Sequence, residues 1–231
     1  MNYLYLLLDL GSLSIPFLFS FHPKLKFYKK WKALFFAIPL TMLIFIPWDV
    51  IFTEQGFWGF NDTYFLNKRL LGLPIEEWLF FICIPYACVF THYALLYYFP
   101  KIKLNDTVTK TLTFALIALF IIMIAINHDK WYTFINFSYA FIMLPIVFYF
   151  NNDLLKSYYV TFLVMLIPFF IVNGILTGSF IEDQVVWYSD SEIIGIRLFT
   201  IPIEDTVYAF TMILTNLVLV EYLQKKFSAI K

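Results

Sequence analysis

Two pairs of adjacent carboxylates lie in a segment that the chain contains twice. Each pair follows a proline and precedes a long apolar run, which is where a helix would begin. Neighbouring carboxyl groups in apolar surroundings cannot all ionise cheaply, so one would keep its proton and could act as a general acid while another acts as a base. The pairs are Glu76 with Glu77 and Glu204 with Asp205, in segments 69–77 and 197–205.

Other polar and aromatic residues stand near the same helix starts. Carboxylates within lipid usually face a protein interior, so we expect a shared polar pocket, which Asp9 joins from two turns into the first apolar run. Aromatic rings beside the acids could stabilise a cation or could simply fill the core. The two arginines could anchor helices at the interface or pair with the acids. The candidate substrate-binding residues are Asp49, Trp48, Trp78, Tyr208, Asn173, Arg69 and Arg197.

The composition predicts a polytopic membrane protein. The chain has 231 residues, of which 61% are hydrophobic, and its mean hydropathy is +0.78, which is too apolar for a soluble core of ordinary proportions. A net charge of zero gives no basic field for nucleic acid. No glycine-rich nucleotide motif and no histidines at metal-ligand spacing are present, so we expect no cofactor and no metal. Cys83 and Cys88 are interpreted as packing thiols.

Seven apolar runs are long enough to cross a bilayer as helices. Twelve of the sixteen Lys and Arg residues fall in the loops after the first, third and fifth runs and in the carboxyl tail. Because positive charge favours the cytoplasmic side, this split predicts a multi-pass protein of the cell membrane with its amino terminus outside and its carboxyl terminus in the cytoplasm. The runs are roughly 3–21, 33–52, 75–99, 111–127, 131–150, 158–178 and 202–223.

The duplication defines the expected domain organisation. Residues 62–69 align with 190–197 at the same offset of 128 residues as the acidic motif. We therefore predict an all-α fold with a three-helix repeat at 1–105, a linking helix at 106–129 and a second repeat at 130–231. The linking helix restores the chain direction, so both repeats run the same way across the membrane. Both acidic pairs would then lie at one depth.

The repeated Pro-x-Glu-(Glu/Asp) motif on a seven-span chain resembles the membrane-integral lycopene cyclase family, which includes two-subunit bacterial cyclases and the cyclase domain of fungal bifunctional enzymes. The matching residues are Pro74 to Glu77 and Pro202 to Asp205, and both cyclase domains would be fused in one chain. The resemblance implies a carotenoid biosynthesis enzyme, a lycopene β-cyclase of the intramolecular lyase (isomerase) class. It would convert the linear ends of lycopene to the β-rings of γ- and β-carotene without net redox change.

Acid–base chemistry agrees with that implication, since an acid could protonate the terminal alkene and a base could remove a ring proton. Glu76 and Glu204 are the leading candidates, with Glu77 and Asp205 tuning their protonation; which residue is the acid stays open. The expected partners are lycopene dissolved in the bilayer, membrane lipid and other enzymes of the carotenoid pathway.

Three other functions compete with the cyclase. A small-solute or proton-coupled transporter with parallel three-helix repeats would also place acids at one end of the bundle. A retinal photoreceptor would need a lysine in the last helix, and 202–223 contains none. A purely structural protein would not require paired acids at equal depth.

Overall fold

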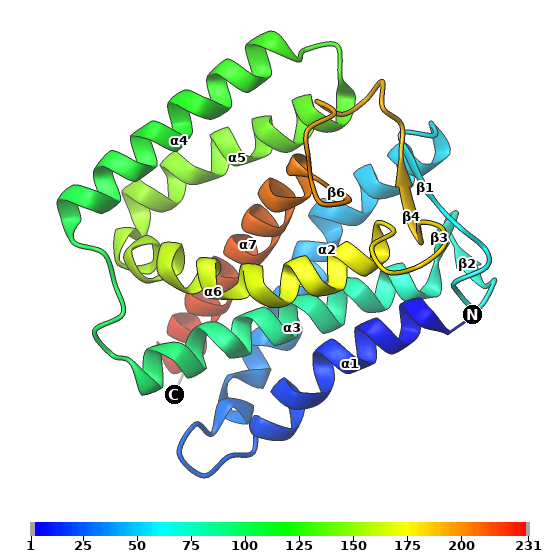
Figure 1. The fold of residues 1–231 in the computed structure, drawn as a ribbon. Coiled ribbons are helices and arrows are strands. Elements are labelled where there is room, and N and C mark those ends of the chain that lie inside the picture. Colours follow the sequence, from blue (N-terminus) through cyan, green and yellow to red (C-terminus); the bar gives the residue numbers. More distant parts are fainter. Residues whose placement is uncertain (1–2, 230–231) are drawn as a thin grey trace.

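The computed structural model describes residues 3–229. In this part of the chain, seven α-helices form a bundle in which consecutive helices alternate in direction (Figure 1). Within this range six helices are long and apolar enough to span a membrane, and α1 is a shorter apolar helix. The predicted all-α membrane protein with seven helices is confirmed. The helices are α1 (Leu4–Phe19), α2 (Trp31–Glu54), α3 (Ile75–Tyr98), α4 (Asp106–Ile126), α5 (Trp131–Phe150), α6 (Asn152–Leu176) and α7 (Ile203–Ala229).

Several helices extend beyond the apolar runs from which they were predicted. Helix α4 begins at Asp106 rather than 111, because the side chain of Asn105 caps it by accepting the backbone N–H of Val108 at 2.8 Å. Helix α7 continues to Ala229 through Lys225 and Lys226. Hydropathy marks the part of a helix that lies in lipid, whereas polar first and last turns remain helical outside it. Lys231 lies outside the described residues.

Each half of the chain packs its middle helix against the acidic helix of the other half. Helix α1 packs on α3 and α5 packs on α7, and each of these pairs joins the first and third helices of one half. Helix α2 packs on α7, and α6 packs on α3, which brings the middle helix of each half against the other half's acidic helix. Helix α4 packs chiefly on α5, at the edge of the bundle (Figure 1). The two acidic helices therefore lie between helices of both halves.

Short strands cover the end of the bundle where α3 and α7 begin (Figure 1). They form three two-stranded antiparallel sheets, which the sequence analysis did not predict. Two are hairpins that lead into the acidic helices, and the third joins the loops of the two halves through β1 and β4. The strands are β1 (Trp58–Phe60), β2 (Arg69–Leu70), β3 (Leu73–Pro74), β4 (Val186–Tyr188), β5 (Arg197–Leu198) and β6 (Ile201–Pro202).

Two hydrophobic clusters fill the interior. The larger involves α2 to α7 and contains most of the buried aliphatic residues. The second lies beneath the strands, where Trp58, Phe60, Phe45 and Phe81 pack with Tyr5 of α1. This aromatic cluster surrounds the starts of the acidic helices and excludes water from them.

Candidate active site between the two repeats

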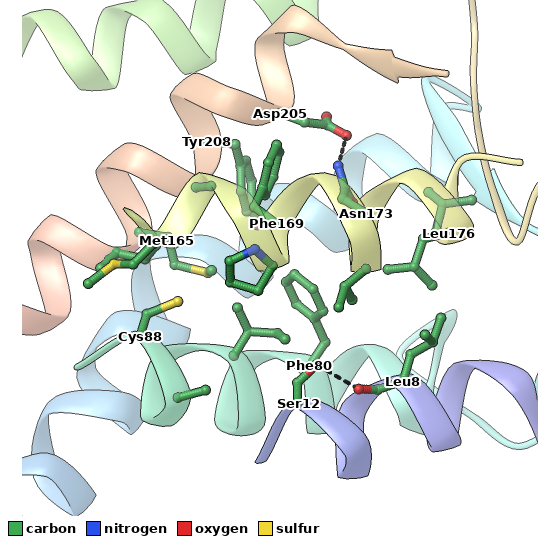
Figure 2. A pocket seen from close by; sticks show the side chains of 18 of the residues that line it. Leu8, Ser12, Phe80, Cys88, Met165, Phe169, Asn173, Leu176, Asp205 and Tyr208 are labelled. Atoms are coloured by element: carbon green, nitrogen blue, oxygen red, sulfur yellow. Dashed lines mark hydrogen bonds between the residues drawn. The ribbon is translucent and has the colours of Figure 1, made fainter. Parts of the chain in front are cut away.

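A largely apolar cavity of about 480 Å³ lies between α1 and α3 on one side and α6 and α7 on the other. Figure 2 shows Asn173 and Asp205 on one wall of it, with Phe80 of α3 on the opposite side. Three carboxylate residues line the cavity: Asp49, Glu77 and Asp205. Glu77 and Asp205 are the second acids of the two motifs, so the cavity is built from both repeats.

One side of the cavity opens toward the position of the lipid. Leu7 and Ile15 of α1 line the cavity, and their exposed fractions are 58% and 65%. An exposed apolar face on a membrane helix contacts acyl chains rather than water. A hydrophobic molecule dissolved in the bilayer could therefore enter between α1 and α6 without crossing the aqueous loops.

Asp205 is held by three hydrogen-bond donors. The hydroxyl of Tyr132 donates to Oδ1 at 2.6 Å. The amide of Asn173 and the hydroxyl of Tyr188 donate to Oδ2 at 2.8 and 2.9 Å. Three donors directed at one carboxylate stabilise its ionised form. Burial, together with the nearby Asp205 carboxylate, raises the pKa of Tyr188 well above its usual value, so this hydroxyl keeps its proton and remains a donor.

Glu77 has a different set of partners. Its Oε2 accepts a hydrogen bond from the hydroxyl of Tyr5. Asp49 of α2 accepts a bond from the indole of Trp58 at 2.9 Å through Oδ1, while its Oδ2 has no hydrogen-bond partner among the described residues. Both oxygens of the buried Asp9 also lack a partner within residues 3–229. The first repeat thus gathers buried carboxyl groups with few donors.

The first acid of each motif is turned away from the cavity. Glu76 accepts the backbone N–H of Leu66 at 2.8 Å, and Glu204 accepts the backbone N–H of Ile194 at 2.6 Å. Glu204 also accepts a bond from the hydroxyl of Thr133 at 2.7 Å. Both side chains are fully buried, and neither lines the cavity. These glutamates tie the loop before each hairpin to the start of the following helix.

The two motif arginines lie at the surface of the hairpins. Arg69 donates to the carbonyl of Gly72 at 2.8 Å and pairs with Asp62 at 2.7 Å. Arg197 donates in the same way to the carbonyl of Thr200 and lies 3.4 Å from Asp190. The structure therefore brings neither arginine to the motif acids nor to the cavity. Instead, each closes its own hairpin.

Of the other predicted substrate-binding residues, some line the cavity and the others pack outside it. Asp49, Asn173 and Tyr208 line the cavity. Trp48 does not, but its ring stacks on Tyr208 with centroids 5.5 Å apart. Trp78 points toward the hairpin, where its indole donates to the carbonyl of Leu70 at 3.1 Å.

Four aromatic hydrogen-bond donors of the cavity were missed by the sequence analysis. They are Tyr5, Tyr132, Tyr188 and Trp58, and all of them donate hydrogen bonds to carboxylates of the cavity. A partial signal was available, because Tyr5 and Tyr132 each lie one helical turn before a buried polar residue, Asp9 or Asn136. The strand residues gave no such signal.

Within residues 3–229, no cation pairs with the acids of the cavity. The four ion pairs of residues 3–229 involve Arg69, Arg197 and Lys156, all outside it. Among the same residues, no group of three or more His, Cys, Asp or Glu side chains has the arrangement of a metal site. The chemistry that these side chains can perform is proton transfer in an apolar, aromatic chamber.

Fold and site together define a multi-pass membrane protein whose two repeats enclose one acidic, apolar cavity. The chain belongs to the lycopene cyclase family, since residues 2–95 and 129–223 both match it. The resemblance found in the sequence is thereby confirmed, and the family's domain occurs twice. The whole of α4 lies between the two matched regions. Searches of curated proteins and of solved structures find no match. Family membership supports cyclisation of a carotenoid as the broad activity.

Proposed function

We propose that the protein is a lycopene β-cyclase, which closes the linear ends of lycopene to β-rings by proton transfer without net redox change. One observation carries this proposal: Glu77 and Asp205 come from different repeats and line the same apolar cavity. Cyclisation needs an acid and a base on one substrate end, and two carboxyl groups in unlike surroundings can supply both.

The reaction consists of two proton transfers with ring closure between them. A carboxylic acid adds a proton to the terminal double bond, and the resulting tertiary cation is attacked by the neighbouring double bond. The second cation, now on the ring, loses a proton to a carboxylate and forms the ring double bond. The substrate gains and loses one proton, so the product is an isomer of the substrate.

The cavity walls suit a cationic intermediate. The rings of Trp58, Tyr132, Tyr188 and Tyr208 line it, and the negative face of an aromatic ring stabilises a nearby cation. The aromatic cluster beneath the strands keeps water away, which prevents capture of the cation as an alcohol. These features support the cyclase over a solute carrier, which would need a hydrated path.

Within each motif we assign the chemistry to the second acid. Glu77 and Asp205 line the cavity, whereas Glu76 and Glu204 bind backbone N–H groups of the loops. This assignment differs from the sequence-based choice of Glu76 and Glu204. In the proposed roles, the first acids hold the hairpins in place and the second acids transfer protons.

We further propose that the acidic end of the bundle faces the outside, because the lysine-rich loops lie at the opposite end. Reporter fusions at the α1–α2 loop and after Ala229 should both report a cytoplasmic location. The expected partners are lycopene in the bilayer, the surrounding lipid and enzymes of the carotenoid pathway that supply lycopene.

Expression in lycopene-accumulating cells tests the proposed function directly. The wild-type chain should convert lycopene to products with β-rings, resolved by chromatography. Glu77→Gln and Asp205→Asn should each lower conversion by about 100-fold or more. Asp62→Asn is the matched control, because it alters an exposed carboxylate at the same end of the bundle and should leave conversion unchanged. Unaltered lycopene in cells that contain folded wild-type protein would rule out the cyclase.

A further inference from the structure

The two repeats surround their cavity acids with opposite chemistry. In the second repeat, three polar side chains donate hydrogen bonds to Asp205: Tyr132, Asn173 and Tyr188. The amide nitrogen of Asn173 can donate but cannot accept a hydrogen bond. A carboxylate accepts all three bonds as they stand, whereas a protonated Asp205 would need one of the tyrosine hydroxyls to turn and accept its proton. The surroundings of Asp205 therefore fit an anion.

In the first repeat, carboxyl groups take the place of donors. Asp9 and Asp49 each lie close enough to Glu77 for their charges to interact. Both are buried, with exposed fractions of 0% and 2%. One oxygen of Asp49 and both oxygens of Asp9 have no partner within residues 3–229. Since no cation of the described residues pairs with them, these three buried carboxyl groups cannot all be ionised, because each unpaired charge would be strongly destabilised.

Corresponding positions show where the repeats diverge. Asp49 of α2 aligns with Asn173 of α6, and each lies near the end of the helix that precedes the strands. Asp9 lies one turn after Tyr5 in α1, as Asn136 lies one turn after Tyr132 in α5. The amide of Asn136 donates to the carbonyl of Glu204 at 2.7 Å. Two carboxyl groups of the first repeat are thus represented by two amides in the second.

We infer that the first repeat supplies the acid and the second repeat supplies the base: Glu77 protonates the terminal double bond, and Asp205 removes the ring proton. This inference rests on the proposed cyclase function and goes beyond it by assigning each step to one residue. Asp9 and Asp49 are positioning residues, since two further buried carboxyl groups beside Glu77 disfavour its ionised form. Tyr132, Asn173 and Tyr188 position Asp205 and hold its charge.

The formation of each ring consumes one proton and releases one. Glu77 loses a proton to the substrate and becomes a carboxylate, while Asp205 gains the proton that the ring releases. Glu77 and Asp205 are close enough for their charges to interact. After the product leaves, loss of a proton from Asp205 to water and uptake of one by Glu77 restore both residues, with no net uptake of protons and no other reactant.

Deuterium transfer distinguishes the two roles. Purified protein in lipid vesicles containing lycopene is equilibrated in D₂O, and both products and recovered lycopene are analysed by mass spectrometry. The wild-type protein should place one deuterium in each ring formed. Asp205→Asn should reduce ring formation by about 100-fold or more, yet recovered lycopene should carry deuterium, because Glu77 still protonates the alkene and the cation reverts. Lycopene recovered with Glu77→Gln should carry none.

A second variant tests the same role of Asp205 without altering Asp205 itself, in case Asp205→Asn does not fold. Asn173→Asp replaces a donor to Asp205 with the carboxyl group found at the matching position of the first repeat. Ring formation should fall by about tenfold or more, as expected for loss of a hydrogen bond to a charged group, while deuterium still enters lycopene. Asp62→Asn should match the wild-type protein in both measurements.

The possible outcomes separate the inference from the proposed function. Deuterium in lycopene recovered with Glu77→Gln, or its absence with both Asp205→Asn and Asn173→Asp, would overturn the assignment of acid and base. Absence of ring formation by the folded wild-type protein would instead overturn the cyclase itself.

Discussion

The two repeats are most alike where the chain builds its hairpins and least alike where side chains meet in the cavity. Both hairpins are closed by an arginine that binds a turn carbonyl, and both first acids bind a backbone N–H ten residues earlier in the chain. By contrast, the neighbours of the second acids are mainly carboxyl groups in one repeat and donors in the other. The repeated part of the motif positions the helices, and in the proposed mechanism the divergent part supplies the difference that acid–base chemistry needs.

The largest expected effect separates the two acids of one motif. Glu77→Gln should lower conversion of lycopene by about 100-fold or more per folded protein. Glu76→Gln should retain most of the conversion, because a glutamine oxygen can still accept the N–H of Leu66. Chromatography of the carotenoids measures the conversion. Each value is divided by the amount of folded protein, which size-exclusion chromatography measures. Equal loss in both folded variants would contradict the division of roles within the motif.

The next effect compares one tyrosine donor of each second acid, Tyr132 for Asp205 and Tyr5 for Glu77. Tyr132→Phe removes a donor from a carboxylate, and such bonds contribute about 1.5–3 kcal/mol, so ring formation should slow by roughly 10- to 100-fold. Tyr5→Phe removes a donor from Glu77, which we infer to be neutral, and should slow ring formation by about tenfold or less. Initial rates in vesicles check this order. A larger loss for Tyr5→Phe would reverse the inferred acid and base.

A smaller effect is expected at the sheet that joins the repeats. A Cβ atom on Gly59 of β1 would clash with the ring of Trp187 on β4, so Gly59→Ala should lower the stability of the protein by about 1–3 kcal/mol through overpacking. The Gly59→Ala/Trp187→Ala double variant should recover part of the loss. Thermal unfolding in detergent measures both. Equal melting temperatures for Gly59→Ala and the double variant would show that the clash with Trp187 does not cause the loss of stability.

The smallest effect is expected at the hairpin arginines. Arg69→Gln and Arg197→Gln remove exposed ion pairs, which contribute about 0–1 kcal/mol, so conversion should stay within about twofold of the wild-type value. The same chromatography checks this expectation. A loss comparable to that of Glu77→Gln would instead place an arginine in the reaction.

The sequence by itself determined the class of protein, the seven helices and the repeat. Hydropathy and charge are properties of local segments, and a motif that occurs twice is visible without coordinates. Membership of the lycopene cyclase family followed from the same residues. The helix ends were less well predicted, since polar turns such as Asp106 to Lys110 continue helices beyond the apolar runs.

Only the tertiary structure decided which acid of each pair faces the cavity. Adjacent residues on a helix point about 100° apart, so Glu76 and Glu77 cannot share one environment, but sequence gives no sign of which one turns inward. The donors to Asp205 come from α5, α6 and β4, which are distant in the chain and meet only when the helices pack. The contrast between a carboxyl-rich and a donor-rich half of one chamber is therefore a product of packing between the repeats.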